Sequence, residues 1–238
     1  VKPIITPRFV PSCTSELMSG LGNLAEAYNV PVQSHLSENH GEIEWVAALH
    51  PEAANYTDVY YEHHLMGKVQ TVMAHCIHLS DVEMDRMAET QTMVSHCPYS
   101  NVNLSSGIAP IRKLFERKIP IGLGSDISGG HIVSMAKVLT EAIGLSKMKW
   151  VEVDQTYAPL TLSEAFYMAT KGGGKFFGKV GSFEKGCELD ALVIDDTTLF
   201  DPNERSLEER LERWLYVGDD RHIVERYVAG KVAPEPTN

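Results

Sequence analysis

A short apolar run that ends on one polar side chain, followed by a helical pattern, recurs along the first 130 residues of this 238-residue chain. The polar side chains are Arg8, His35, His75, His96 and Asp126. Their spacing is close to the ~30 residues of a βα unit. Because the apolar runs are continuous and do not alternate with polar residues, they predict strands that are covered on both faces, as in a parallel sheet.

Polar residues at the carboxyl ends of parallel strands are typical of the active face of a (β/α)8 barrel. Only about five such units fit before residue 130, whereas a closed barrel has eight. The sequence therefore predicts an α/β fold that is a partial (β/α)8 TIM-like barrel, made of about its last five βα units. Roughly three strands are expected outside this chain, and the absence of an initial Met suggests a cleaved product or a partial chain.

The strands are predicted within residues 4–9, 30–35, 71–75, 92–96 and 119–126. Helical spacing predicts helices within 14–28, around 114–115 and within 132–143, and capping-box spacing predicts further helix starts at Ser80 and Thr161. The glycine-rich run 171–175 lacks the Walker spacing, so it predicts a helix C-cap and not a phosphate-binding loop.

The pattern changes after residue 178. Segments 191–195 and 224–231 have β character, and a charged helical stretch at 207–214 separates them. We expect residues 1–178 to form the C-terminal part of the barrel. Residues 179–238 are expected to form a small β-rich appendage with one helix and a frayed polar tail.

Charge and apolar content exclude several classes of partner. Lys plus Arg number 21 and Asp plus Glu number 32, which gives a net charge of −11. This field repels polyanions, so a nucleic-acid polymer is not expected, and the lack of ~18 consecutive apolar residues argues against a membrane span. The four cysteines contain no C-x-x-C pair and are expected to be reduced thiols of a cytoplasmic protein.

Three predicted strand ends carry side chains that suit metal and acid–base chemistry. His35 and Glu38 lie three residues apart and can face one cavity, although a surface pair has the same spacing. His75 and Asp126 end two later strands, where a hydrogen-bonded core histidine and a turn-forming aspartate are the alternatives. Two imidazoles and a carboxylate at the same end of successive strands would satisfy the ligand preferences of Zn²⁺.

Arg8 and Phe9 end the first predicted strand. The planar guanidinium of Arg8 offers five donors, which suits the carbonyl and ring-nitrogen edge of a heterocycle, and a helix-capping or salt-bridged arginine is equally compatible with this position. Phe9 suits either stacking on a flat ligand or filling the core. This pair therefore predicts a small heterocyclic partner.

The order of these motifs resembles the amidohydrolase superfamily, and within it the guanine deaminases. The resemblance covers nearly the whole chain and rests on Thr6-Pro7-Arg8-Phe9, Gln33-Ser34-His35-Leu36-Ser37-Glu38-Asn39, Ala74-His75-Cys76, Ser95-His96-Cys97-Pro98-Tyr99-Ser100-Asn101 with Leu104-Ser105-Ser106-Gly107, and Gly122-Leu123-Gly124-Ser125-Asp126.

The resemblance implies hydrolytic deamination of guanine to xanthine and ammonia, with one Zn²⁺ per complete subunit held in part by His35 and Asp126. It implies Glu38 as the acid–base group, Asp126 as a proton acceptor, and His75 as the holder of the attacking water or the substrate. A purine small molecule and a second copy of the chain, in a homodimer, are the partners it implies. The residues implied for contact with guanine are Arg8, Phe9, His35 and Glu38.

One part of the family pattern is missing. Family members carry a His-x-His pair on the first strand, and no such pair occurs in these 238 residues. Two ligands are fewer than the four that zinc usually takes, so this chain alone is predicted to bind zinc poorly and to be inactive. The alternatives are a related deaminase or chlorohydrolase for another heterocycle, or a non-catalytic fragment that acts through protein contacts.

Overall fold

The computed structural model describes residues 2–234. Its elements, in chain order, are η1 (Val10–Ser12), α1 (Ser15–Tyr28), β1 (Val32–Leu36), α2 (His40–Leu49), α3 (Tyr56–Glu62), β2 (Thr71–His75), α4 (Asp81–Glu89), β3 (Met93–His96), α5 (Pro98–Asn103), α6 (Ile111–Glu116), β4 (Ile121–Leu123), α7 (Met135–Glu152), α8 (Leu162–Tyr167), η2 (Met168–Gly172), β5 (Ala191–Ile194), α9 (Leu207–Val217), η3 (Asp220–His222), β6 (Ile223–Val228) and β7 (Lys231–Val232).

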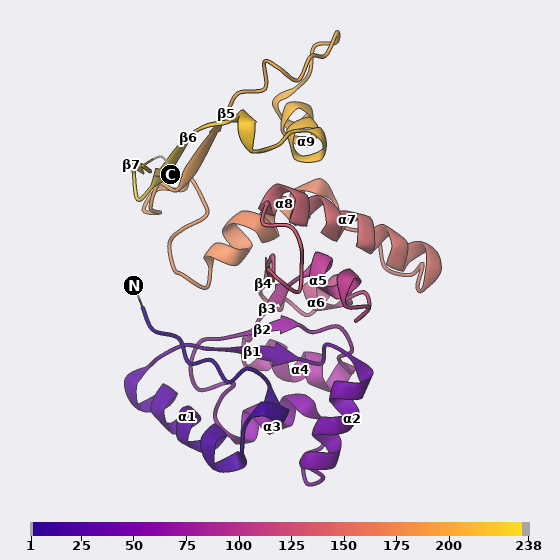
Figure 1. The fold of residues 1–238 in the computed structure, drawn as a ribbon, viewed down its shortest axis with the longest axis vertical. Coiled ribbons are helices and arrows are strands. Elements are labelled where there is room, and N and C mark those ends of the chain that lie inside the picture. The colour runs from indigo at the N-terminus through magenta and orange to yellow at the C-terminus, as the bar shows by residue number, and fades with distance from the viewer. Residues whose placement is uncertain (1, 235–238) are drawn as a thin grey trace.

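Strands β1 to β4 form a parallel sheet in sequence order, with helices between successive strands (Figure 1). The register pairs Leu36 with His75 and His96 with Leu123, so the carboxyl ends of the four strands meet at one edge. The predicted α/β class and parallel sheet are therefore confirmed. The partial barrel stays a prediction.

The predicted strand at residues 4–9 is reduced to a single parallel bridge between Ile5 and Val32. Pro3 and Pro7 flank Ile5, and a proline cannot donate a backbone hydrogen bond to a sheet. The amides of Gln33 and His35 nevertheless donate to the carbonyl oxygens of Ile5 and Arg8. The segment therefore runs along β1 without forming a regular strand.

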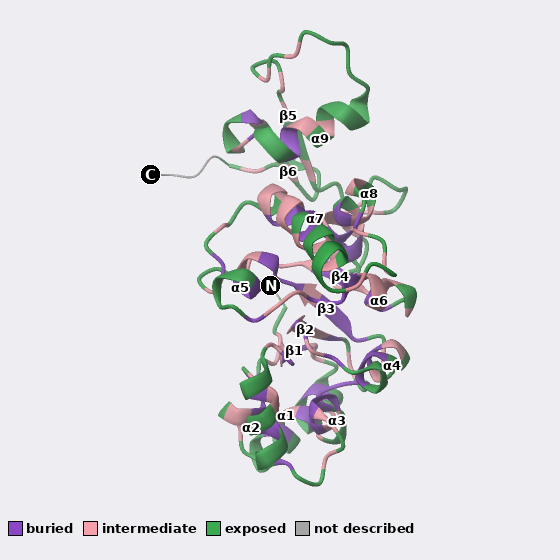
Figure 2. Ribbon diagram, turned by 90° about the vertical axis from the view of Figure 1, so that its right-hand side faces the viewer, coloured by how far each residue is buried: buried purple, intermediate pink, exposed green. Residues whose placement is uncertain are grey.

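The two faces of the parallel sheet are covered unequally. In β1 and β2 buried and partly exposed residues alternate, because one face packs against helices and the other does not (Figure 2). Met73 is fully buried on the helix-covered face, whereas Val72 and Ala74 line a cavity on the other face. This alternation differs from the continuous coverage that the apolar runs predicted.

Helix starts follow the predicted signals. Ser80 and Thr161 accept a hydrogen bond from the N3 amide, and the N3 glutamate of each accepts one in return, so both capping boxes are present. The helix predicted within 132–143 begins only at Met135. The helix that follows Thr161 passes into the π-turn η2, whose C-cap is Gly173, so the helix ends within the glycine-rich run as predicted. A Cβ on Gly172 would lie 2.7 Å from the Ile121 carbonyl oxygen.

A second sheet of three antiparallel strands, β5, β6 and β7, lies at the other end of the molecule beside α9 (Figure 1). Lys137 Nζ donates to the carbonyl oxygen of Tyr216, which ties α7 to the end of α9. Division of the chain at residue 178 stays a prediction. Within residues 2–234 no helix is both long and apolar enough to cross a bilayer.

Candidate active site

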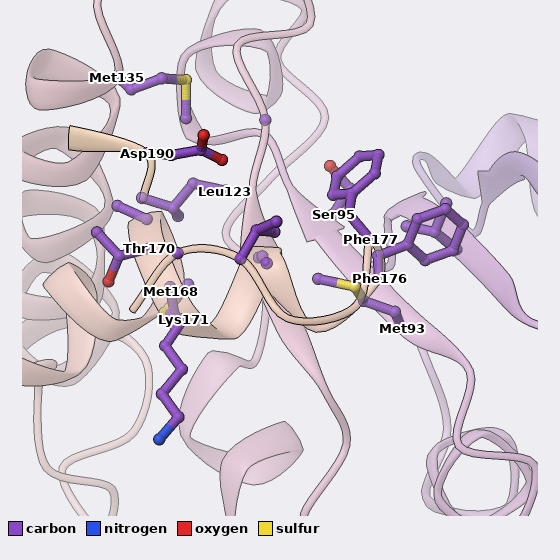
Figure 3. A pocket seen from close by; sticks show the side chains of 18 of the residues that line it. Met93, Ser95, Leu123, Met135, Met168, Thr170, Lys171, Phe176, Phe177 and Asp190 are labelled. Carbon is purple, nitrogen blue, oxygen red and sulfur yellow. The ribbon is translucent and has the colours of Figure 1, made fainter. Parts of the chain in front are cut away.

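The uncovered face of the parallel sheet borders a cavity of about 1770 Å³. Figure 3 shows side chains of β3 and β4 and of the segment after η2 pointing toward this space, among them Met93, Leu123 and Phe177. His35 and Asp126 also line it, at the edge where the strands end. The cavity exceeds the ~300–1,000 Å³ of ordinary ligand pockets, so the site occupies one part of a larger open face.

Three residues predicted from the sequence, His35, Glu38 and Asp126, surround the imidazole of His75. Its ring stacks on that of His35, with centroids 5.3 Å apart and planes 21° apart. His75 Nε2 lies 3.7 Å from Glu38 Oε2 and 3.9 Å from Asp126 Oδ2. His75 is 1% exposed, so two carboxylates converge on one buried imidazole, and the site attracts a proton or a cation.

The orientation of His35 leaves one ring nitrogen available. His35 Nδ1 donates to the backbone carbonyl oxygen of Arg8, so this nitrogen carries the proton and Nε2 keeps its lone pair. Metal-bound histidines are usually held in this way through their second nitrogen. The local geometry of His35 therefore suits a metal ligand.

Left-handed backbone conformations occur at the strand ends that carry the site. Ser37, His75 and Asp126 have φ values of 49°, 69° and 42°, which is uncommon for residues other than glycine. Strand alternation would place His75 on the helix-covered face with Thr71 and Met73. The positive φ ends the alternation at His75, and its ring instead stacks on His35.

Arg8 and Phe9 lie next to this cluster, although only the backbone of Arg8 contacts it. The exposed guanidinium of Arg8 lies 5.5 Å from the centroid of the Phe9 ring. The Phe9 ring in turn meets Trp45 edge-on at 6.1 Å. The two side chains thus form an aromatic and cationic surface beside His35, and their contact with a substrate stays a prediction.

Sequence reasoning gave no role to three residues that hold the reacting groups. Asn101 Oδ1 accepts from His75 Nδ1 at 3.0 Å, and Ser106 Oγ donates to Glu38 Oε1 at 3.0 Å. Glu42, 7% exposed, accepts from the amide of Glu38 at 2.9 Å. Asn101 and Ser106 belong to recognised motifs, and the Asn39-x-x-Glu42 spacing is a capping box, so the signals were present in the sequence.

Two further side chains near the site are kept neutral by burial. Burial, with the nearby His75 charge as a smaller cause, lowers the pKa of His96 to about 3. Burial raises the pKa of the Cys97 thiol to about 12. His96 and Cys97 therefore carry no charge at neutral pH.

The donor types fit a zinc site, but their number falls short. His35 Nε2 and the Asp126 carboxylate are a nitrogen and an oxygen donor of the kind that zinc accepts. Among residues 2–234 no group of three His, Cys, Asp or Glu side chains is arranged to hold a metal. The described residues thus offer two donors of the types that zinc accepts, fewer than its usual four.

Polar side chains at the carboxyl ends of parallel strands mark the usual place of the active site in α/β-barrel enzymes. A model of the amidohydrolase family matches residues 1–233, and the chain belongs to this family. The resemblance found from the motifs is confirmed. Among solved structures, the guanine deaminase from C. acetobutylicum with bound guanine has a TM-score of 0.95 and 54% sequence identity, over 98% of this chain and 55% of that one.

Curated relatives carry the same name. The guanine deaminase of Dictyostelium discoideum is 44% identical over 237 residues, which are 97% of this chain and 52% of the relative. The guanine deaminase of Escherichia coli (strain K12) is 38% identical over 240 residues, or 97% of this chain and 53% of the relative. The chain thus spans about half the length of the curated relatives it matches.

Proposed function

We propose that the protein to which this chain belongs is a zinc-dependent guanine deaminase. The observation that carries the proposal is the meeting of His35, Glu38, His75 and Asp126 at one strand-end edge, with both carboxylates within 4 Å of His75 Nε2. The guanine deaminases among its relatives, which match 97% of this chain, support guanine as the substrate.

Zinc would be held in part by His35 Nε2 and Asp126, with its other ligands supplied from outside residues 2–234. When bound, zinc makes a water molecule acidic enough to supply a nucleophile near neutral pH. Two donors cannot complete the usual four-coordinate site. The 238-residue chain is therefore proposed to hold zinc weakly and to lack activity alone.

The chain's own residues would bind the base and move protons. The overall reaction converts guanine and water into xanthine and ammonia: a C–O bond forms and the bond to the exocyclic nitrogen breaks. One proton of the water ends on the ring nitrogen and the other leaves with ammonia. Glu38 Oε2, which faces His75 Nε2, would carry a proton to the ring nitrogen, as a positioned carboxyl group can.

His75 would hold the attacking water or the substrate, and Asp126 would accept a proton from that water. Arg8 would donate to the guanine carbonyl, and the Phe9 ring would stack on the purine. The guanidinium of Arg8 lies 5.5 Å from the centroid of the Phe9 ring, which keeps the two groups close together. These roles describe how the residues of the site would contact the water and the bound base.

The proposal also covers the complete barrel, the oligomeric state and the compartment of the protein. The uncovered sheet face would be the interior of a (β/α)8 barrel that further strands of the complete protein close, with the C-terminal sheet as an appendage. A homodimer in the cytoplasm is proposed as well. The thiols support this compartment, since the four cysteines form no disulfide in the part that the structure describes.

The test is a turnover screen with the full-length protein, purified with zinc. Guanine, adenine, cytosine, 5'-deoxyadenosine and a chlorotriazine would be supplied in turn, and ammonia or chloride release measured together with the product. We expect xanthine and ammonia from guanine with the highest kcat/KM. A higher kcat/KM for another heterocycle would replace the substrate, and inactivity with all five would favour a non-catalytic role.

A further inference from the structure

We propose that Ser106 and Asn101 are positioning residues for the deamination. Ser106 holds Glu38 Oε1 so that Oε2 faces the site, and Asn101 holds His75 Nδ1 so that Nε2 faces the site. The proposal rests on the proposed function. It concerns two side chains on the segment that follows β3, and it assigns different tasks to the two oxygens of Glu38 and to the two nitrogens of His75.

The two carboxylate oxygens of Glu38 have different surroundings. Oε1 accepts a hydrogen bond from Ser106 Oγ at 3.0 Å, whereas Oε2 lies 3.7 Å from His75 Nε2. A contact of 3.7 Å is too long for a hydrogen bond, so Oε2 is the oxygen available for proton transfer. Without the Ser106 hydroxyl the carboxylate could rotate and exchange the two oxygens.

His75 shows the same division of tasks. Its Nδ1 donates to Asn101 Oδ1 at 3.0 Å, and its Nε2 faces Glu38 and Asp126. An amide oxygen only accepts hydrogen bonds, so this contact places the ring proton on Nδ1 in the neutral imidazole. Nε2 is left to face the water or the substrate.

The segment that carries both residues is held firmly enough to position them. Asn101 and Ser106 are 1% and 6% exposed. The amide of Ser106 donates to the Asn101 carbonyl oxygen at 2.8 Å, and the Ser106 carbonyl oxygen accepts from His78 Nε2 at 2.8 Å. The backbone of Ser106 is therefore held on both sides, which keeps its hydroxyl within reach of Glu38 Oε1.

The experiment is a double-mutant cycle in the full-length zinc-loaded protein with Ser106→Ala, Glu38→Gln and their combination. Alone, Ser106→Ala is expected to lower kcat by about 10–100-fold, as loss of a supporting hydrogen bond to an active-site group does. KM for guanine, zinc content and melting temperature are expected to stay at wild-type values. In the Glu38→Gln background, Ser106→Ala is expected to cause no further loss, since Ser106 acts through Glu38.

Ser100→Ala is the matched control, because Ser100 lies on the same segment, is 0% exposed, and its hydroxyl makes no hydrogen bond in the described part of the chain. It is expected to keep the wild-type kcat. Wild-type kcat in Ser106→Ala overturns the proposal. A full additional loss on top of Glu38→Gln, or a joint fall of kcat, zinc content and melting temperature, overturns it too, since it would show a structural role.

The role of Asn101 is tested by the same kind of double-mutant cycle, with Asn101→Ala, His75→Ala and their combination. Additive losses of kcat count against the proposal. The Ser106 cycle decides the matter on its own if Asn101→Ala does not fold. The wild-type protein separates this test from the proposed function. If it deaminates another base in the screen, both cycles are run with that base.

Discussion

Glu38 follows a left-handed residue, Ser37, at the end of β1, and its side chain is partly buried between Ser106 and His75. Its position relies on other buried groups, since Glu42 accepts from the Glu38 amide and from the Tyr56 hydroxyl. Burial raises the pKa of Tyr56 far above its usual range, so this phenol remains a hydrogen-bond donor at all working pH values.

Replacing Glu38 by Gln in the full-length protein removes the proton carrier and keeps the shape of the side chain. We expect kcat for guanine to fall about 10²–10⁴-fold, the range for a positioned acid–base group, with zinc content unchanged. Glu44→Gln is the control, because Glu44 is exposed on α2 in the same sequence neighbourhood. Steady-state kinetics that show equal kcat values for the two variants would remove Glu38 from the mechanism.

Helices α6 and α8 are joined by one ion pair of two hydrogen bonds. Arg112 donates from both terminal nitrogens to the two oxygens of Glu164, at 2.6 and 2.8 Å. The Arg112 guanidinium lowers the pKa of Glu164 from 4.5 to about 2. A carboxylate with a lowered pKa in the folded state stabilises the protein above its unfolded pKa, and this contribution is lost as the pH falls through the folded pKa.

Glu164→Gln is therefore expected to lower the free energy of unfolding by about 1 kcal/mol at pH 7, a modest value because both side chains are partly exposed. The difference from wild type should shrink as the pH falls from 4.5 toward 2, where Glu164 becomes protonated. Urea unfolding at several pH values measures this. Glu152→Gln, at the exposed end of α7, is the control, and a constant Glu164→Gln difference over this range would contradict the assignment.

Strand β4 packs against the end of η2 through two glycines, Gly122 in β4 and Gly173 directly after η2, which let the backbones approach closely. A Cβ on Gly122 would lie 2.7 Å from Met93 Cε and 2.9 Å from the Cα of Gly173. Gly122→Ala is expected to cost about 1–3 kcal/mol of stability through overpacking.

Gly144→Ala tests the same substitution where space is open, since nothing lies within 4 Å of its Cβ position in α7. It is expected to raise stability by up to ~1 kcal/mol, because alanine has the higher helix propensity. Thermal or urea unfolding of both variants measures the contrast. Equal effects of the two substitutions would show that the β4–η2 contact is less tight than described.

The molecule as a whole leaves one face of its parallel sheet open, with a cavity of about 1770 Å³ between this face and the C-terminal segments. An open sheet face of this kind is unusual in a (β/α)8 barrel, whose interior is filled by side chains. Under the proposed function, further strands of the complete protein would cover this face and supply the remaining zinc ligands.

The 238-residue chain expressed alone is thus expected to hold less than one zinc per chain after dialysis and to release no ammonia from guanine. The full-length protein should retain one zinc per subunit under the same conditions, since four ligands are then available. Metal analysis by mass spectrometry and the ammonia assay provide the comparison. One tightly held zinc in the isolated chain would contradict the shared coordination shell.

Several strands, two helix starts and the residues of the candidate site could be predicted from the sequence alone, because the signals involved are local. Continuous apolar runs predicted the strands, and a serine or threonine three residues before a glutamate predicted two helix starts, since both depend on contacts within a few residues. Polar side chains at the strand ends predicted that His35, Glu38, His75 and Asp126 would meet, because parallel strands in one sheet end at one edge.

Only the tertiary structure decided which atoms of these residues face the site. Ser106 and Glu38 are 68 residues apart in sequence, so their hydrogen bond depends on strand register and on the path of two crossovers. The left-handed backbone of His75, which accompanies the stacking of its ring on His35, was not predicted from the sequence. Contacts across such separations form only when the whole sheet is assembled, so the periodicity of the sequence does not predict them.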